Sequence, residues 1–189
     1  YFFKLILYSL FLLYSFMGIY AIKPLFQKFL SPLSKLLIKF KVHPTYINLV
    51  GLLLSLIGGY ALLVSFEQPL WLIFVPFMAF IRTACNALDG MVARALKVPN
   101  QGFGEVLNEF FDRISDAAIF LGLAFATYTN VILGVVVTVL ILLNSYLSIV
   151  SKAAGGSRQY GGVMGKADRM LYLGLITIVL AGWQLWYLG

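Results

Sequence analysis

Six apolar stretches, each long enough to cross a lipid bilayer, divide this chain and limit what it can fold into. They cover roughly residues 3–22, 46–66, 69–93, 103–127, 131–151 and 164–188. A run of about 20 apolar residues crosses the hydrocarbon core as an α-helix, because a helix satisfies its own backbone hydrogen bonds there. Hydrophobic residues make up 61% of the chain and charged residues 11%, a balance that soluble domains do not reach. The sequence therefore predicts an all-α integral membrane protein with six transmembrane helices in a single polytopic domain, residues 1–189.

The first stretch, residues 3–22, is too long for the apolar core of a signal peptide and lacks a small-residue cleavage site, so we interpret it as a span. The chain begins at Tyr1 rather than at Met. We therefore expect the sequence to be a trimmed portion, from which helices could be missing at either end.

Lysines and arginines are concentrated in the connections after the first, third and fifth stretches, whereas the other two connections carry none. By the positive-inside rule, residues 23–45, 95–102 and 152–163 face the cytoplasm. The net charge of +7 thus reflects membrane topology. We expect no binding to nucleic acid, because no soluble domain carries these basic residues.

Residues 24–41 predict an amphipathic helix that lies on the cytoplasmic membrane surface. Ser31 can cap a helix whose first turn contains Pro32. At 100° per residue, three lysines share one narrow face and apolar side chains occupy the others, which suits lysines directed toward phosphate headgroups. These lysines are Lys28, Lys35 and Lys39. The alternative is a basic anchor without a catalytic task.

Five of the seven acidic residues lie within 28 positions. They are Asp89, Glu105, Glu109, Asp112 and Asp116. On a helix that begins at Gly104, the last four of them and Asn108 fall within a wedge of about 100°. Asn86 and Asp89 share one face of the preceding helix. Because the loop 95–102 is short, we expect residues 86–112 to form an antiparallel helix hairpin whose oxygen-rich faces meet as a cation site.

The donor types indicate which cation this site would take. Carboxylate and amide oxygens, without cysteine or histidine nearby, favour Mg²⁺, Mn²⁺ or Ca²⁺ over zinc. Alternatively, the acids pair with the buried arginines Arg82 and Arg113. Asp116 and Arg82 each lie about 18 Å along their helices from the hairpin end, at matching depth. We predict a structural ion pair between these two, which leaves Asp89 and Asp112 for chemistry.

The hairpin sequence reads Asn-x-x-Asp-Gly-x-x-Ala-Arg and then Gly-x-x-x-Asn-x-x-x-Asp. It resembles the signature of the CDP-alcohol phosphatidyltransferase family of membrane enzymes, D-x-x-D-G-x-x-A-R followed by G-x-x-x-D-x-x-x-D. The matching positions are Asn86, Asp89, Gly90, Ala93, Arg94, Gly104, Asn108 and Asp112. The resemblance is close over residues 86–112 and extends loosely to the order of the spans on either side.

This resemblance implies a reaction and a role for each motif position. An acceptor alcohol attacks the phosphorus of a CDP-linked lipid such as CDP-diacylglycerol, and CMP leaves, with Mg²⁺ or Mn²⁺ stabilising the developing charge. The implied metal ligands are Asn86, Asp89, Asn108 and Asp112, and the implied CDP-site residues are Gly90, Ala93, Arg94 and Gly104. By the same resemblance, Asp112 is the general base that takes the proton of the acceptor hydroxyl.

Two motif positions depart from the family, because Asn86 and Asn108 stand where it has aspartates. The site loses two negative charges, so its affinity for metal should fall. Glu105 or Glu109 could restore charge, the site could hold one ion instead of two, or the protein could be inactive. We favour an adapted enzyme, because the other motif residues persist. The spans also differ, with one before the interfacial helix and five after it, where the family usually has six after it.

Residues 152–169 add four cations and five glycines on the predicted cytoplasmic side. Glycine allows turns that bring backbone amides to phosphate, and the cations supply charge. We expect an acceptor pocket here, with Arg158, Lys166 and Arg169 as phosphate contacts. A flexible loop that only fixes topology is the alternative.

These features together predict a metal-dependent transferase of phospholipid synthesis whose acceptor is a small alcohol or a phosphorylated polyol. We expect a homodimer, because family members are commonly dimers, in the inner membrane if the source is bacterial. The rival interpretation is an inactive lipid- or nucleotide-binding protein, or a transport protein, that uses the acids as a cation site. The position of the motif at the cytoplasmic edge, where a soluble nucleotide arrives, favours the enzyme.

Overall fold

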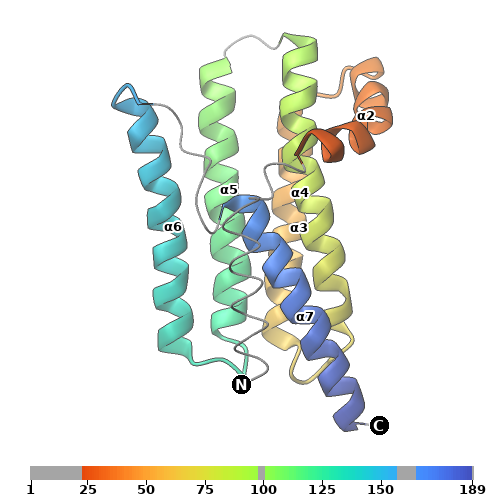
Figure 1. The fold of residues 1–189 in the computed structure, drawn as a ribbon, viewed down its shortest axis with the longest axis vertical. Helices are drawn as coiled ribbons and strands as arrows, with labels where there is room; N and C mark the ends of the chain where they lie inside the picture. Colours follow the sequence, from red (N-terminus) through yellow and green to blue (C-terminus); the bar gives the residue numbers. More distant parts are fainter. Residues whose placement is uncertain (1–22, 98–100, 157–164, 189) are drawn as a thin grey trace.

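A computed structural model describes residues 23–97, 101–156 and 165–188, which form six α-helices (Figure 1). The helices are α2 (Lys23–Lys39), α3 (Pro44–Val64), α4 (Trp71–Leu96), α5 (Gln101–Ala124), α6 (Val131–Ala153) and α7 (Lys166–Leu188). The predicted all-α class is confirmed for these residues. Each of the last five helices begins and ends within about three residues of a predicted span.

Four helices, α3, α4, α6 and α7, are long and apolar enough to cross a membrane. The span predicted at 103–127 is α5, whose 24 residues include too many charges for it to count among these four. Its charged side chains are Glu105, Glu109, Asp112, Arg113 and Asp116. The first predicted span, residues 3–22, lies outside the described residues. The described helices thus account for four of the six predicted spans.

Helix α3 packs along both α4 and α5, whereas α4 and α5 make only slight contact with each other. Two glycines allow α3 and α5 to approach each other closely. A Cβ atom at Gly122 of α5 would lie 2.1 Å from the carbonyl oxygen of Gly59 in α3, and one at Gly59 would lie 2.3 Å from the carbonyl oxygen of Ala118. The backbones of α4 and α5 are not in close contact along their length, and the two helices meet through polar side chains, Asn86 with Asp112 and Arg82 with Asp116.

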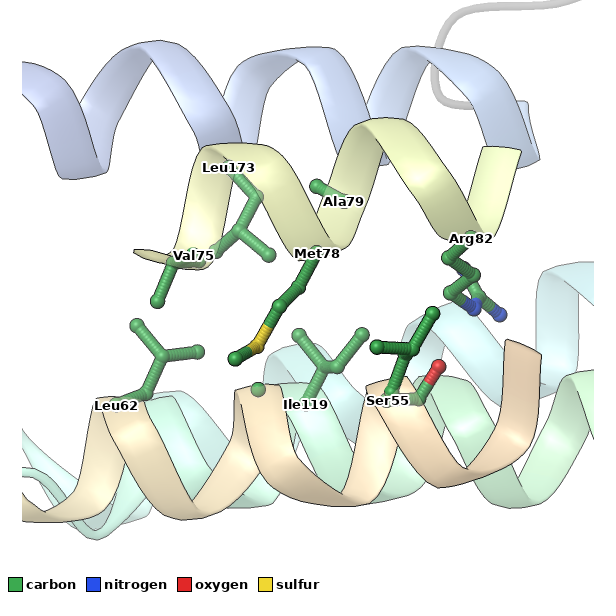
Figure 2. A pocket seen from close by; sticks show the side chains of 10 residues that line it. Ser55, Leu62, Val75, Met78, Ala79, Arg82, Ile119 and Leu173 are labelled. Carbon is green, nitrogen blue, oxygen red and sulfur yellow. The ribbon is translucent and has the colours of Figure 1, made fainter. Parts of the chain in front are cut away.

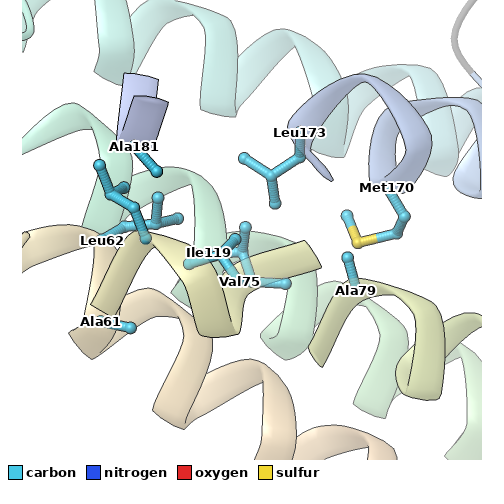
Figure 3. Packing of buried hydrophobic residues seen from close by; sticks show 9 residues of the cluster. Ala61, Leu62, Val75, Ala79, Ile119, Met170, Leu173 and Ala181 are labelled. Atoms are coloured by element: carbon cyan, nitrogen blue, oxygen red, sulfur yellow. The ribbon is translucent and has the colours of Figure 1, made fainter. Parts of the chain in front are cut away.

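Apolar side chains from α3, α4, α5 and α7 form a core toward the N-terminal half of α4. Figure 3 shows Leu62, Val75, Ile119 and Leu173 pointing toward one another from these four helices. Helix α7 also packs closely along α4. This packing fixes the beginning of α7 beside the acidic face of α5, which is where the polar side chains converge.

The short helix α2 lies against α4 and covers a second apolar cluster that includes Ile47, Cys85 and Leu88. We expect a helix over residues 24–41, and α2 covers Lys23–Lys39 and continues through Pro32, so Ser31 does not cap it. A proline inside a helix removes one backbone hydrogen bond and bends the helix, and α2 changes direction along its length (Figure 1). The capping role of Ser31 is wrong, because the residues before it, such as the buried Leu30, are already helical and packed into this cluster.

Candidate functional site

Asp116 of α5 is completely buried and lies between arginines from two other helices. Its Oδ1 atom accepts a hydrogen bond from Arg82 Nη2 of α4 at 2.8 Å, and its Oδ2 atom accepts one from Arg169 Nη2 of α7 at 2.7 Å. None of the three side chains is more than 2% exposed. The predicted pair of Arg82 with Asp116 is confirmed, and Arg169 is a second partner that the sequence did not reveal.

Asp112 lies one turn before Asp116 and is contacted from both neighbouring helices. Asn86 Nδ2 of α4 donates a hydrogen bond to its Oδ1 atom at 3.2 Å, and Lys166 Nζ of α7 donates one to its Oδ2 atom. Arg82 Nη2 lies 3.8 Å from Oδ1. The structure therefore joins the first and last positions of the sequence motif, and both oxygens of the buried carboxylate have donors.

Asp89 is buried on α4, and its Oδ1 atom accepts a hydrogen bond from the backbone N–H of Gly90 at 2.6 Å. The side-chain amide of Asn48, from α3, lies beside Asp89. The Oδ1 atom of Asn48 is buried and has no hydrogen-bond partner. Sequence analysis missed Asn48 because it is uncharged and lies within an apolar stretch. A single amide inside a predicted span is the signal that could have revealed it.

The two glutamates considered for charge compensation point to different neighbours. Glu109 is buried, 3.4 Å from Lys166 Nζ and 3.2 Å from Arg113 Nη2, so it shares Lys166 with Asp112. Glu105 is partly exposed and pairs with Lys152 of α6. Glu109 thus lies at the site, while the ion pair with Lys152 directs Glu105 toward α6.

The residues expected to line a nucleotide site lie at the far end of α4 and the beginning of α5. An added Cβ atom at Gly90 would come within 3.3 Å of Arg94 Nη1, so the exposed arginine folds back over this glycine. Ala93 is partly buried beside them. Gly104 is exposed, with nothing within 4 Å of an added Cβ atom, and the partly buried Asn108 follows one turn later. This end of the helix pair is therefore sterically open at Gly104, whereas Arg94 covers Gly90.

The cations expected at an acceptor pocket differ in their surroundings. Helix α7 begins part-way down the bundle, below the end that joins α4 to α5 (Figure 1). Lys166, its first residue, has a side chain 29% exposed and reaches Asp112 and Glu109. Arg169 is buried against Asp116 and lies 3.5 Å from Ser145 Oγ of α6. Arg158 lies outside the described residues.

A small cavity of about 10 Å³ lies between the apolar core and this ionic cluster. Figure 2 shows Met78 and Ile119 on its apolar side and Ser55 and Arg82 at its polar end. The space is of the order of one water molecule. Neither a nucleotide nor a lipid fits there.

The family resemblance implies a bound divalent metal ion. Asp89 and Asp112, the carboxylates at the two ends of the site, differ in how well their surroundings suit such an ion. At Asp89, the unpartnered buried oxygen of Asn48 adds a second hard donor beside a carboxylate, as such ions require. At Asp112, both oxygens already accept from protein donors. Among the described residues, no three histidine, cysteine, aspartate or glutamate side chains form a group that could hold a metal ion. The Asp89 end therefore fits an ion, and the Asp112 end, as it stands, does not.

Apolar helices of spanning length around a buried polar site define a multi-pass membrane protein. Residues 41–189 match the CDP-alcohol phosphatidyltransferase family, and the chain belongs to this family. It is 37% identical over 170 residues to Inner membrane protein YnbA of Escherichia coli (strain K12), covering 90% of this chain and 84% of that protein.

Two further relatives have names that state a reaction. The Archaetidylinositol phosphate synthase of Pyrococcus horikoshii is 28% identical over 164 residues, which cover 83% of this chain and 80% of that protein. The Phosphatidylinositol phosphate synthase of Corynebacterium glutamicum is 28% identical over 173 residues, which cover 88% and 75%. Family and relatives together favour a transferase of phospholipid synthesis over an inactive binding protein. The family is generally dependent on a divalent metal.

Proposed function

We propose that this protein transfers a phosphatidyl-type group from CDP-diacylglycerol, or a similar CDP-alcohol, to an acceptor alcohol and releases CMP. The contact that carries the proposal is the one between Asn86 and Asp112, which joins the two halves of the family motif across α4 and α5. The oxygen of the acceptor hydroxyl forms a bond to the lipid-bearing phosphorus. The bond from that phosphorus to the CMP oxygen breaks, and the hydroxyl proton passes to Asp112.

The surroundings of Asp112 suit the role of general base. The donors from Asn86 and Lys166 hold the carboxylate in a fixed orientation. A carboxylate oxygen has two lone pairs, so an oxygen that already accepts one hydrogen bond can still take a proton. Asp112 is 4% exposed, which keeps bulk water from competing with the acceptor hydroxyl.

At the donor end, the open space at Gly104 supports binding of the CDP group, with Arg94, which folds over Gly90, as a contact to its phosphate. A divalent ion, Mg²⁺ or Mn²⁺, would be held at Asp89. The motif also implies Asn86, Asn108 and Asp112 as ligands, and of these Asn86 and Asp112 are hydrogen bonded to each other. When bound, the ion would neutralise charge that develops on the phosphates.

For the acceptor, we propose Arg158, Lys166 and Arg169 as phosphate contacts. Lys166 is the best supported, because it is partly exposed and lies beside Asp112, so a phosphate that it holds would bring its hydroxyl near the base. Arg169 would have to share its guanidinium with Asp116. The relatives named for inositol phosphate products make a phosphorylated polyol the first acceptor class to test.

The membrane arrangement follows from the same reasoning. We propose six spans, including residues 3–22 and α5, with the motif end of the bundle in the cytoplasm, and α2 lying at the membrane surface. The exposed apolar side chains of α2, such as Leu25 and Phe29, support its contact with lipid. We also propose a homodimer.

The test is CMP release by the purified protein in lipid, with CDP-diacylglycerol, Mn²⁺ or Mg²⁺, and a panel of alcohols that includes phosphorylated polyols. We expect acceptor-dependent CMP that a chelator abolishes and that Asp112→Asn lowers by at least about 100-fold, the usual contribution of a general base. Glu67→Gln, a change at an exposed acid between α3 and α4, is the control and should retain activity. Binding of CDP-diacylglycerol without CMP release from any acceptor would favour the inactive binding protein instead.

A further inference from the structure

We propose that the ammonium group of Lys166 takes the place of a divalent ion at Asp112, so that the site binds one divalent ion, at the Asp89 end. The inference deepens the proposed function, because it rests on Asp112 and Asp89 being the two working carboxylates. It concerns cation binding alone, and it can therefore be tested without turnover.

Lys166 occupies the position that a cation at Asp112 would need. Its Nζ atom donates to Asp112 Oδ2 and lies 3.4 Å from Glu109 Oε1, so one ammonium bridges two carboxylates of α5. A divalent ion at Asp112 would have to displace this ammonium. It would also approach the guanidinium of Arg82, 3.8 Å from Asp112 Oδ1. Two fixed positive charges close to one carboxylate disfavour a third cation there.

The asparagine at position 86 fits a site without a metal at this end. A carboxylate accepts hydrogen bonds and donates none, so the Asn86 atom that faces Asp112 must be the amide nitrogen. With an aspartate at position 86, two carboxylates would meet at hydrogen-bond distance and would need a cation between them. The amide removes that need, because Asn86 binds Asp112 directly.

The placement of Lys166 is not explained by its own helix. It is the first residue of α7, where the helix dipole disfavours positive charge. Asp168 makes the favourable interaction there, because its Oδ2 atom accepts from the backbone N–H of Gly165 at 2.9 Å. The lysine is instead stabilised by the carboxylates of α5, which indicates that these acids, rather than helix formation, account for a cation at this position.

The charges around Asp112 and Asp116 are balanced by the protein itself. Four cationic side chains face three carboxylates in this cluster, namely Arg82, Arg113, Lys166 and Arg169 against Glu109, Asp112 and Asp116. Asp89, in contrast, accepts from the backbone N–H of Gly90 and lies beside the amide of Asn48, both neutral, and Lys166, which bonds to Asp112 and Glu109, acts on it only through space. The charge that a divalent ion would neutralise is therefore found at Asp89.

The experiment counts Mn²⁺ ions bound per chain, by electron paramagnetic resonance of free Mn²⁺ and by calorimetry, on the purified full chain with no nucleotide or lipid substrate. We expect one Mn²⁺ per chain in the wild type. The double variant Asn86→Asp with Lys166→Met restores a carboxylate and removes the ammonium, and it should bind two. A metal pair about 3.5–4 Å apart would also show spin coupling.

The matched control is Asn86→Asp with Lys152→Met, which removes a lysine from the exposed pair with Glu105 on the same end of the bundle. It should still bind one Mn²⁺. Lys166→Arg keeps the charge and should also bind one, and it serves as a second variant if the double variant does not fold. Two ions, or none, in the wild type would overturn the inference, as would a second ion in Lys166→Arg or a single ion in the folded double variant.

The two proposals fail in different ways. One Mn²⁺ per chain without CMP release from any acceptor would refute the proposed function and leave the lysine in its role. CMP release by a wild type that binds two Mn²⁺ would refute the role of Lys166 and leave the transferase.

Discussion

Replacing Asp116 by asparagine should be the most destabilising single change of charge in the described bundle. The carboxylate binds Arg82 at 2.8 Å and Arg169 at 2.7 Å, and neither arginine side chain is more than 2% exposed. Asparagine keeps one oxygen acceptor, so one guanidinium retains a hydrogen bond while the other faces an amide N–H₂ group. Removing one partner of a buried ion pair costs about 3–5 kcal/mol, because a buried charge loses its compensation. We expect Asp116→Asn to lose stability in this range.

The assay is reversible unfolding in mixed detergent micelles, followed by circular dichroism as the fraction of denaturing detergent rises. Glu105→Gln is the control, because it breaks a pair whose side chains are 40% and 48% exposed, and exposed pairs contribute about 1 kcal/mol or less. Arg169→Gln completes a double-mutant cycle. Because Asp116 and Arg169 are in contact, the double variant should lose less than the sum of the single losses.

One result would refute this reasoning about Asp116. If Asp116→Asn loses no more stability than Glu105→Gln, the two arginines find compensation elsewhere, and the buried cluster does not hold α4, α5 and α7 together. Additive losses in the cycle would show that Arg169 and Asp116 act independently.

Two further predictions concern α3. Gly122→Ala should destabilise the protein by several kcal/mol in the same assay, because its Cβ atom would lie 2.1 Å from a backbone oxygen. The control Gly182→Ala, with open space around it, should be neutral or slightly stabilising. Equal effects of the two substitutions would contradict the close approach of α3 and α5. Asn48→Leu should weaken Mn²⁺ binding by at least about tenfold in a calorimetric titration, as loss of an outer oxygen donor does. The control Ser55→Ala, further along α3, should leave Mn²⁺ binding unchanged. Unchanged binding in Asn48→Leu would exclude the Asn48 oxygen from the ion site.

The helices could be predicted from the sequence because hydropathy and helical periodicity are local properties. The acidic face of α5 followed from the spacing of Glu109, Asp112 and Asp116, and the pair of Arg82 with Asp116 followed from matching depth. The roles of the motif residues stay predictions, because they concern ligands rather than packing.

What the sequence did not reveal depends on how whole helices are placed. The close approach of α3 to α5 follows from Gly59 and Gly122, whose importance is visible only when both backbones are in place. Lys166 reaches Asp112 because α7 begins part-way down the bundle, and the spacing along the chain does not fix that depth. Asn48 was missed because an amide in an apolar stretch carries no charge to attract attention.

The ionic contacts of Asp116 also bear on how the helices find their alignment during assembly. Between helices in lipid, apolar side chains are as well solvated by acyl chains as by each other, so they select one sliding position only weakly. A shift of α5 by one turn, about 5.4 Å, would separate Asp116 from the arginines of both α4 and α7. Three helices inserted separately therefore have one low-energy alignment, and it is the alignment that sets Asn86 opposite Asp112.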